Sequence, residues 1–264
     1  MSAIKEITSV QNALVKKMIL LKEKSRERKK TRLFVIEGQR ELDLALKGGY
    51  VIDTLCVCPE ITEIDFAQAD LKIKTIHISK EVFKKVAHRD TTEGVLALVE
   101  SKEHSLQSSF KLKENPLILV AEAPEKPGNL GALLRTADAA NLDAVLIANP
   151  KTDLYNPNII RSSVGCIFTN KIVTGSSKEL INFLNNQKIK IFCAALTASK
   201  NYVEADFTGG SAIVVGTEAT GLTDEWLNNS FQNVIIPMQG EIDSMNVSVS
   251  AAILIFEAKR QRGF

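Results

Sequence analysis

The sequence contains no apolar run long enough to cross a bilayer, and its first residues, MSAIKEITSVQN, lack the apolar core and cleavage site of a secretory signal. Cysteine is scarce. The four cysteines, Cys56, Cys58, Cys166 and Cys193, match neither a zinc spacing nor a disulfide framework. These absences disfavour membrane and secreted proteins, and they predict a cytoplasmic protein with reduced, mostly buried thiols.

Other common signatures are also missing. No G-x-G-x-x-G follows an expected strand, which disfavours a Rossmann-type nucleotide enzyme. No group of Asp, Glu and His has metal-ligand spacing, so we expect no metal, and there is no internal repeat or low-complexity tract. With 264 residues, of which 45% are hydrophobic and 24% charged, the chain is typical of a soluble globular protein of one large domain or two ordinary ones.

Charge is unevenly distributed along the chain. Residues 1–32 hold ten Lys and Arg against three Glu, a net charge of +7, while the rest holds 23 basic and 28 acidic residues, a net charge of −5. A basic segment on a mildly acidic body indicates a polyanionic partner. The alternative is a solvated helix face or a mobile terminus.

The first hundred residues predict a small α/β domain. An amphipathic helix, capped by Thr8 or Ser9, is expected to run to about Lys30. The apolar runs and glycine stops that follow predict strands at 33–38, 51–58, 71–78 and 95–99 and helices at 40–47 and 80–87. Residues 101–116 are polar, rich in serine and end in proline, so we expect an interdomain linker there.

From residue 117 to 264 strands and helices alternate regularly. Strands are expected at 117–122, 144–148, 189–196, 212–216 and 234–236, and helices at 129–140, 178–187, from 224 and at 247–262. A helical turn is expected at 157–162. This alternation predicts an α/β domain with a parallel sheet covered on both faces.

Three turns of this second half carry polar residues directly after expected strands. They read P-G-N-L-G-A-L-L-R at 127–135, G-T-E-A-T-G-L at 216–222, and I-P-M at 236–238 followed by S-M-N-V-S-V-S-A at 244–251. Between the first two turns lie N-P at 156–157 and R-S-S-V-G at 161–165. Each motif alone is weak evidence, and Ser244 and Asn246 could simply cap the last helix. Their order along the chain is the informative feature.

Together these motifs resemble the SpoU (TrmH) branch of the SPOUT RNA 2′-O-ribose methyltransferases. The resemblance covers about residues 117–262, and residues 20–100 are more weakly similar to the L30e-like RNA-binding domain that often precedes the catalytic one. Two departures are conservative. Met245 replaces the usual Leu, and Asn141 stands in place of a Gly after the first helix, where Asn tolerates the left-handed conformation.

The resemblance implies a C-terminal parallel-sheet SPOUT domain with a deep trefoil knot, a homodimer packed through the knotted region, and S-adenosylmethionine as cofactor. It implies methylation of structured RNA and favours ribosomal RNA (23S) over transfer RNA because an L30e-like domain comes first. A non-catalytic RNA-binding or assembly protein of the same fold is the alternative. Neither the RNA nor the nucleotide can be read from the sequence.

The resemblance also assigns roles to individual residues. The catalytic set is Asn129, Arg135, Glu218, Ser244 and Asn246. The cofactor is expected on the backbone of Leu196, Gly216, Ile236, Met238 and Met245. Because a guanidinium stays protonated in proteins, we expect Arg135 to hold a phosphate and stabilise developing charge rather than act as a base. Asn129 and Arg135 would converge only if Asn129 lay in the cap turn before its helix.

RNA contacts are expected from the basic N-terminal segment and from one later arginine: Lys22, Lys24, Arg28, Lys29, Lys30 and Arg161. The charges are expected to contact phosphates and to position the RNA rather than to read bases. The histidines at 77, 88 and 104 are expected to have no catalytic role, although His88 could contact RNA.

Overall fold

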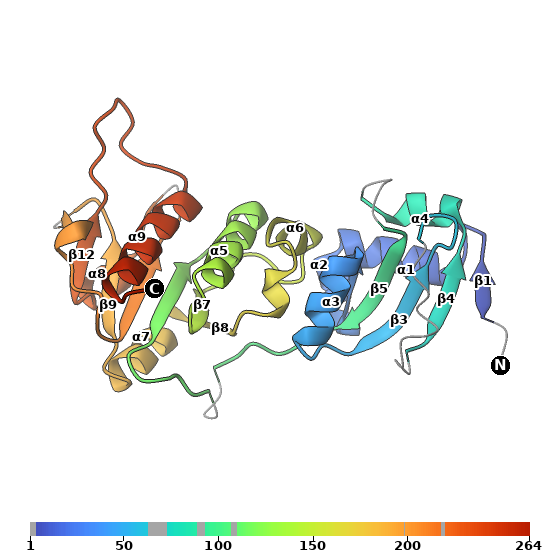
Figure 1. The fold of residues 1–264 in the computed structure, drawn as a ribbon, viewed down its shortest axis with the longest axis horizontal. Helices are drawn as coiled ribbons and strands as arrows, with labels where there is room; N and C mark the ends of the chain where they lie inside the picture. Colours follow the sequence, from blue (N-terminus) through green and yellow to red (C-terminus); the bar gives the residue numbers. More distant parts are fainter. Residues whose placement is uncertain (1–3, 63–72, 89–92, 107–109, 198, 218–219) are drawn as a thin grey trace. The chain divides into compact units, whose positions relative to one another are not determined.

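The computed structural model describes residues 4–62, 73–88, 93–106, 110–197, 199–217 and 220–264. The chain divides into two units: Met1–Lys102 with Leu154–Thr169, and Glu103–Asp153 with Asn170–Phe264 (Figure 1). Both are α/β, as the sequence predicts, and each has a hydrophobic core of its own. Within the described residues, no helix is long and apolar enough to cross a membrane.

The first unit is built on a five-stranded mixed sheet in the order β1-β4-β3-β5-β2, in which β1, β4 and β3 are parallel and β5 is antiparallel to both its neighbours. Its strands are β1 (Lys5–Ile7), β2 (Leu33–Glu37), β3 (Ile52–Val57), β4 (Thr75–Ile78) and β5 (Val95–Glu100). Its helices are α1 (Ala13–Glu23), α2 (Ser25–Thr31), α3 (Gln39–Lys47), α4 (Lys80–Val86) and α6 (Pro157–Ser162), with the 3₁₀ turn η1 (Cys166–Phe168).

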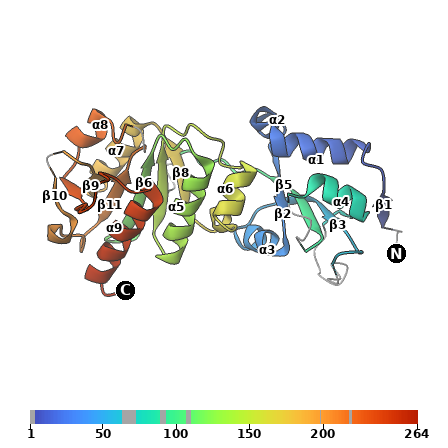
Figure 2. The same cartoon turned by 90° about the horizontal axis from the view of Figure 1, so that it is seen from above.

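The second unit is built on a seven-stranded sheet, wholly parallel, in the order β10-β12-β9-β11-β6-β7-β8. Its strands are β6 (Leu117–Glu122), β7 (Ala144–Ala148), β8 (Ile172–Gly175), β9 (Lys190–Ala194), β10 (Lys200–Asn201), β11 (Ser211–Val215) and β12 (Gln232–Ile235). Its helices are α5 (Pro127–Ala139), α7 (Ser177–Asn186), α8 (Asp224–Asn228) and α9 (Val247–Gln261), with η2 (Tyr202–Glu204). Helices α5 and α9 cover one face, and α7 and α8 the other (Figure 2). The predicted parallel sheet is confirmed.

The single N-terminal helix predicted to run to about Lys30 is two helices. Asn12, not Thr8 or Ser9, caps α1, because its side chain accepts a hydrogen bond from the Leu14 amide at 2.9 Å. The helix breaks at Lys24, whose backbone is extended with φ −114° and ψ 108°, and α2 follows directly. The break lets the buried residues of α1 pack on the sheet while the more polar α2 takes another direction.

Residues 154–169 belong to the first unit, although the sequence places them within the expected C-terminal domain. Aromatic packing explains their position. The Tyr155 ring stacks on Phe34 with centroids 4.2 Å apart, and the Phe168 ring lies 5.9 Å from Phe34. The Tyr155 hydroxyl also accepts a hydrogen bond from the Lys102 amide at 2.9 Å. Such an aromatic cluster buries a large apolar area, and the partner of this segment is distant in sequence.

The polar stretch 101–116, expected as a linker, contributes to the second unit from residue 103 onward. Leu106, Phe110 and Leu112 pack against its core, and Ser105 forms an isolated parallel bridge to Thr174 of β8. The stretch therefore covers the outer edge of β8, a short strand that the sequence pattern did not predict. Asn141, with φ +47°, adopts the left-handed conformation expected where the helix preceding β7 ends.

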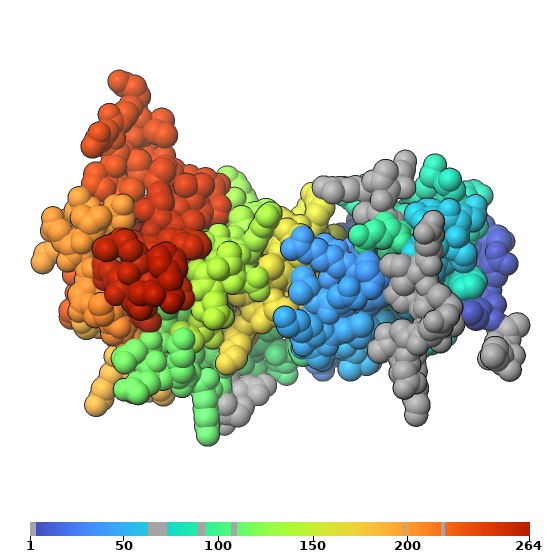
Figure 3. Space-filling model, in the orientation of Figure 1, coloured from blue at the N-terminus to red at the C-terminus, as the bar shows by residue number. Residues whose placement is uncertain are grey.

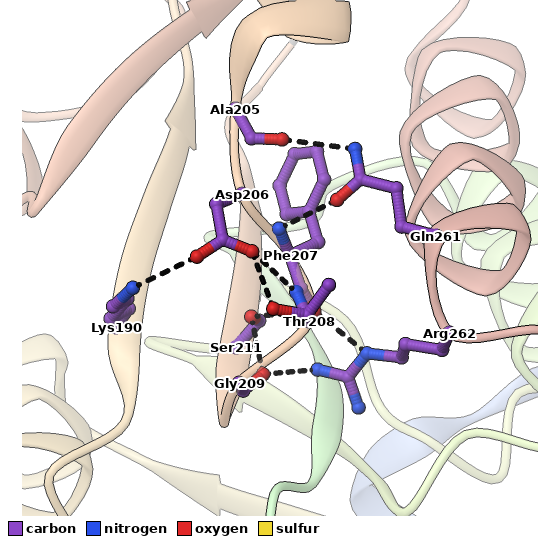
Figure 4. A network of polar contacts seen from close by, with 9 residues as sticks. All are labelled: Lys190, Ala205, Asp206, Phe207, Thr208, Gly209, Ser211, Gln261 and Arg262. Carbon is purple, nitrogen blue, oxygen red and sulfur yellow. Dashed lines mark hydrogen bonds and ion pairs between the residues drawn. The ribbon is translucent and has the colours of Figure 1, made fainter.

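The final helix returns from β12, near one end of the sheet, to pack on α5, β6 and β11. Its end is held by a polar network around the loop at 205–211 (Figure 4). The Arg262 guanidinium donates to the carbonyl oxygens of Phe207 and Asn115, each at 2.8 Å, and to that of Gly209. The Gln261 amide donates to Ala205 O and accepts from Phe207 N, each at 2.9 Å. These contacts fix the C-terminus of α9, and the trefoil knot itself stays a prediction.

The four cysteines are free and buried, as the sequence predicts. Burial raises the pKa values of Cys56 and Cys193 to about 12, which leaves little of the reactive thiolate form at neutral pH.

Candidate functional site

A cavity of about 570 Å³ lies in the second unit at the ends of three neighbouring parallel strands. The segments following β9, β11 and β12 form its wall, together with the residues that precede α9. Parallel strands end at the same edge of a sheet, so the polar backbone groups after each strand face a common space. The long loop between β12 and α9, which contributes to this wall, projects away from the sheet (Figures 1 and 3).

All five residues expected to hold the cofactor line this cavity: Leu196, Gly216, Ile236, Met238 and Met245. They come from four separate segments of the chain. Ser244, expected in the catalytic set, lines the same cavity, and its hydroxyl donates to the Asp243 carboxylate at 3.1 Å. Several further lining residues were not singled out from the sequence, among them Thr197, Thr217, Thr220 and Asp243. Their position directly after strands, or before the last helix, is the signal that could have found them.

Gly216 is needed for a reason that the sequence did not reveal. We expected the missing side chain to let a ligand approach the backbone, which stays a prediction. In addition, a Cβ at this position would lie 2.3 Å from the carbonyl carbon and oxygen of Gly221. The two glycines flank a turn closed by reciprocal backbone hydrogen bonds between Thr217 and Gly221 at 3.1 and 3.0 Å. The glycine therefore allows the chain to fold back on itself, and this turn forms one wall of the cavity.

Asn129 and Asn246 are brought together, although 117 positions separate them. The Asn246 amide donates to the Asn129 side-chain oxygen at 3.1 Å. Asn246 is also the N-cap of α9, since its oxygen accepts from the Ser248 amide at 2.9 Å. The capping interpretation is therefore correct for Asn246, and the same side chain joins α9 to α5. A smaller cavity of about 80 Å³ beside Asn129 shares Gly216, Thr217 and Val247 with the larger one.

Arg135 is not brought to this pair within one chain. Helix α5 begins at Pro127, so Asn129 lies inside its first turn rather than in a cap turn before it. Six residues along one helix place the two side chains about 120° apart around the axis and about 9 Å apart along it. Arg135 is exposed, and among the described residues no hydrogen bond or ion pair holds its guanidinium. Glu218, the remaining member of the catalytic set, lies outside the described residues.

The residues expected to contact RNA fall into two groups, all in the first unit. Lys24, Lys29 and Lys30 are exposed on and beside α2, and so are Arg26 and Arg32, which the sequence analysis did not select. The other two residues selected from the basic segment, Lys22 and Arg28, make internal contacts.

Arg28 is only 5% exposed, and its guanidinium donates to Leu21 O at 2.6 Å and Lys22 O at 3.1 Å. It thereby satisfies carbonyl groups at the C-terminus of α1, which the helix itself leaves unpaired. The Lys22 ammonium forms an ion pair with Glu37 at 3.2 Å and donates to the Val86 carbonyl. Counting charges along the sequence does not distinguish a cation that pairs with groups inside the domain from one that is exposed to solvent.

Arg161 lies on α6 and is exposed. Its guanidinium donates to the Asn158 side chain at 3.0 Å and contacts the His88 ring. Together with Glu37 and Glu41 these residues line a cavity of about 120 Å³ in the first unit. Burial raises the pKa of Glu41, with the nearby Glu93 and Glu37 carboxylates adding to the rise and Arg40 opposing it.

No group of three or more His, Cys, Asp and Glu arranged to hold a metal ion occurs in the part of the chain that the structure describes. His77 lies in β4, and His104 holds the edge of β8, where its carbonyl accepts from the Thr174 amide at 2.6 Å. The arrangement of the second unit instead offers backbone groups around a mixed polar and apolar cavity, beside a pair of amide side chains.

Comparison with known proteins identifies both parts of the chain. Residues 116–256 match the model of the SpoU rRNA Methylase family, and residues 12–97 match that of the MRM3-like substrate binding domain. The 23S rRNA (guanosine(2553)-2′-O)-methyltransferase RlmP of Bacillus subtilis is 31% identical over 97% of this chain and 100% of its own length.

Solved structures agree with these matches. A crystal structure described as an RNA 2′-O ribose methyltransferase has a TM-score of 0.85 and 38% identity, covering 98% of this chain and 100% of that one. The AdoMet-bound rRNA methyltransferase of Sinorhizobium meliloti has a TM-score of 0.89 and 26% identity, covering 97% of this chain and 98% of that one. The family model spans more than half of the chain, and the relative spans nearly all of it. The resemblance stated from the motifs is therefore confirmed, and the chain belongs to the SpoU rRNA methylase family.

Proposed function

We propose that this protein transfers a methyl group from S-adenosylmethionine to the 2′-hydroxyl of a ribose in structured RNA, with 23S ribosomal RNA as the favoured substrate. The observation that carries the proposal is the convergence of the five expected cofactor residues on one cavity beside the Asn129–Asn246 pair. The relatives support it, since RlmP is a 23S rRNA 2′-O-methyltransferase and the Sinorhizobium meliloti structure is AdoMet-bound.

The cavity fits this cofactor in size and chemistry. Its volume of about 570 Å³ lies within the range of small-molecule sites in proteins. Leu196, Met238 and Met245 provide apolar wall, while the backbone groups following three strands provide hydrogen-bond donors and acceptors. When bound, S-adenosylmethionine supplies a methyl group already activated on a cationic sulfur.

The residues of the chain then have to position the nucleophile. The Asn129–Asn246 pair is held rigidly by the cap of α9, so its amides can orient the ribose hydroxyl with little reorganisation. Arg135, separated from the pair along α5, is suited to hold a phosphate of the RNA and to stabilise charge that develops on the oxygen. Ser244 lines the cavity and is assigned an orienting role, as is Glu218.

The exposed cations around α2, together with Arg161, are proposed to contact RNA phosphates. Five cations at 24, 26, 29, 30 and 32 are exposed within nine residues, and such a density attracts a polyanion. Because Lys22 and Arg28 are committed to the fold of the first unit, they are not part of this surface. Phosphate contacts would position the RNA while the second unit selects the ribose.

A homodimer is proposed because α9 leaves apolar residues uncovered. On α9, Val249 is 48% exposed and Phe256 41%, and Phe264, beyond the end of the helix, is 77% exposed, although the other side of the helix is buried against α5 and the sheet. Exposed apolar groups clustered on one helix are typical of an interface. We also place the protein in the cytoplasm, where its free thiols remain reduced and ribosomal RNA is available.

The activity is tested with methyl-labelled S-adenosylmethionine and ribosomal RNA from a strain lacking the gene. Label is expected on the 2′-oxygen of one nucleotide after nuclease digestion and mass spectrometry. RNA from the complemented strain, already methylated, serves as the control and is expected to take up none. Tight binding of both RNA and S-adenosylmethionine without any transfer would instead favour the non-catalytic RNA-binding alternative.

Cofactor recognition is tested separately by calorimetry. S-adenosylmethionine or its demethylated product is expected to bind without RNA, and NAD is expected not to bind. The oligomeric state is tested by light scattering, with Phe256→Glu expected to give a monomer if α9 forms the interface. A monomeric unchanged chain at micromolar concentration would contradict the proposed dimer.

A further inference from the structure

The carboxyl group of Glu122 is buried at the end of β6, and both of its oxygens accept hydrogen bonds. The residue is 2% exposed. One oxygen accepts hydrogen bonds from the Ser177 hydroxyl at 3.2 Å and the Thr223 hydroxyl at 2.7 Å, and the other accepts from the Thr223 amide at 2.9 Å. Removing a carboxyl group from water is unfavourable unless such partners compensate, so its presence here requires an explanation.

The direction of these hydrogen bonds is fixed by the surrounding groups. The Ser177 hydroxyl already accepts from the Trp226 ring nitrogen and from the Asn149 amide, each at 2.9 Å. A hydroxyl oxygen has two lone pairs, so the Ser177 proton must be donated, and Glu122 is its acceptor. The Thr223 amide can only donate. Both oxygens at position 122 must therefore be acceptors, a requirement that a carboxylate meets and an amide does not.

Glu122 connects two parts of the candidate site. Thr223 follows directly Thr220, Gly221 and Leu222, which line the larger cavity and complete the turn that Thr217 and Gly221 close. Glu122 itself lines the smaller cavity beside Asn129, and β6 leads within a few residues into the helix that carries Asn129. One buried side chain thus ties the cofactor side of the site to the side expected to hold the ribose.

We infer that Glu122 is a positioning residue: through Thr223 it holds residues 220–222, and with them the hydrogen bonds between Thr217 and Gly221, in the geometry that binds S-adenosylmethionine next to Asn129. The inference rests on the proposed function, because it takes the larger cavity as the cofactor site. A residue that only filled space in the core could be replaced by an apolar one without affecting cofactor binding. A residue that positions the turn could not.

The test compares three variants by calorimetric titration with S-adenosylmethionine and by thermal unfolding. Glu122→Gln places an amide nitrogen against a group that can only donate, whichever way the amide points. Thr223→Val keeps the side-chain shape and the backbone amide but removes the hydroxyl contact. Ser176→Ala is the matched control. It removes the cap of α7, one residue from Ser177, without touching the carboxyl group.

Cofactor affinity is expected to fall at least about tenfold in Glu122→Gln and about tenfold in Thr223→Val, from the loss of a hydrogen bond to a charged group. Ser176→Ala is expected to unfold at a lower temperature yet bind the cofactor within about twofold of the unchanged chain. If Glu122→Gln does not fold, the comparison of Thr223→Val with Ser176→Ala decides.

Two results would overturn the inference. One is cofactor affinity in Thr223→Val or in folded Glu122→Gln equal to that of the unchanged chain. The other is an equal loss of affinity in Ser176→Ala, which would show that destabilisation alone is responsible. Failure of the proposed function looks different, because the unchanged chain itself would then not bind S-adenosylmethionine.

Discussion

The candidate cofactor cavity and the basic N-terminal segment were each predicted as a set of residues, and the structure places the two sets differently. All five residues expected at the cavity line it, although they come from four separate segments. Of the five cations selected from the basic segment, three are exposed and two, Lys22 and Arg28, make internal contacts.

The difference has a physical cause. The cavity residues were assigned by resemblance to a family whose motifs follow the strands, and the parallel sheet brings the ends of its strands to one edge. Cations were selected by charge alone, and a long cationic side chain can serve either a solvent-exposed surface or an unpaired carbonyl group inside a domain. Place in the fold is therefore a stronger guide to a site than residue type. The following experiments can break or sharpen this comparison.

The largest effect is expected at Arg135. Arg135→Ala should lower methyl transfer by about a hundredfold to a thousandfold, because charge stabilisation and phosphate contact are both lost. Arg135→Lys should fail almost as completely, since an ammonium group does not reproduce the planar two-pronged contact. Cofactor affinity should stay unchanged in both variants by calorimetry. Near-normal turnover in Arg135→Lys would contradict the proposed role.

Gly216→Ala should disrupt the cavity itself. The added Cβ would lie 2.3 Å from the Gly221 backbone, which cannot move without opening the turn. We expect about 3 kcal/mol lower stability and loss of cofactor binding. Gly128→Ala is the matched control, because its Cβ meets no atom within 4 Å and alanine favours the helix. Normal cofactor binding in Gly216→Ala would show that the turn does not shape the site.

Arg28 and its neighbour Lys29 test whether a buried cation stabilises the first unit more than an exposed one does. Arg28→Met should lower the free energy of unfolding by about 2 kcal/mol, because the buried carbonyl groups of Leu21 and Lys22 lose their donor. Lys29→Met, at an exposed position, should change it by less than about 0.5 kcal/mol. Urea denaturation measures both. Equal effects would remove the distinction drawn between these two cations.

The smallest effect is expected from the exposed cations. Changing Lys24, Lys29 and Lys30 to Gln should weaken RNA binding and flatten the plot of log affinity against log salt by about 2 to 3 in slope, if each contacts one phosphate. Lys22 and Arg28 are left intact so that folding is not disturbed. Filter binding at several salt concentrations measures the slope. An unchanged slope, in a variant whose circular dichroism spectrum matches that of the unchanged chain, would show that these cations face solvent without contacting RNA.

Local patterns predicted much of the second unit. Residues 117–122 and 144–148 form strands over the ranges expected, because both are apolar runs long enough to be buried on two faces. The short strands β8 and β10 were missed, since four and two residues carry too little periodicity to be recognised. The same limit explains why the break at Lys24 in the N-terminal helix was not foreseen.

The sequence by itself determined the family, the parallel sheet and the residues around the cavity, because motif order and strand ends are local features of the chain. Only the tertiary structure decided that Tyr155 packs on Phe34 in the first unit, that Arg28 closes a helix, and that Gly216 accommodates Gly221. It also revealed the buried carboxyl group of Glu122 and its donors. Each of these depends on which group a side chain or backbone contacts in the folded protein. Burial and hydrogen bonding between segments distant in sequence leave no signal in the local periodicity of the sequence.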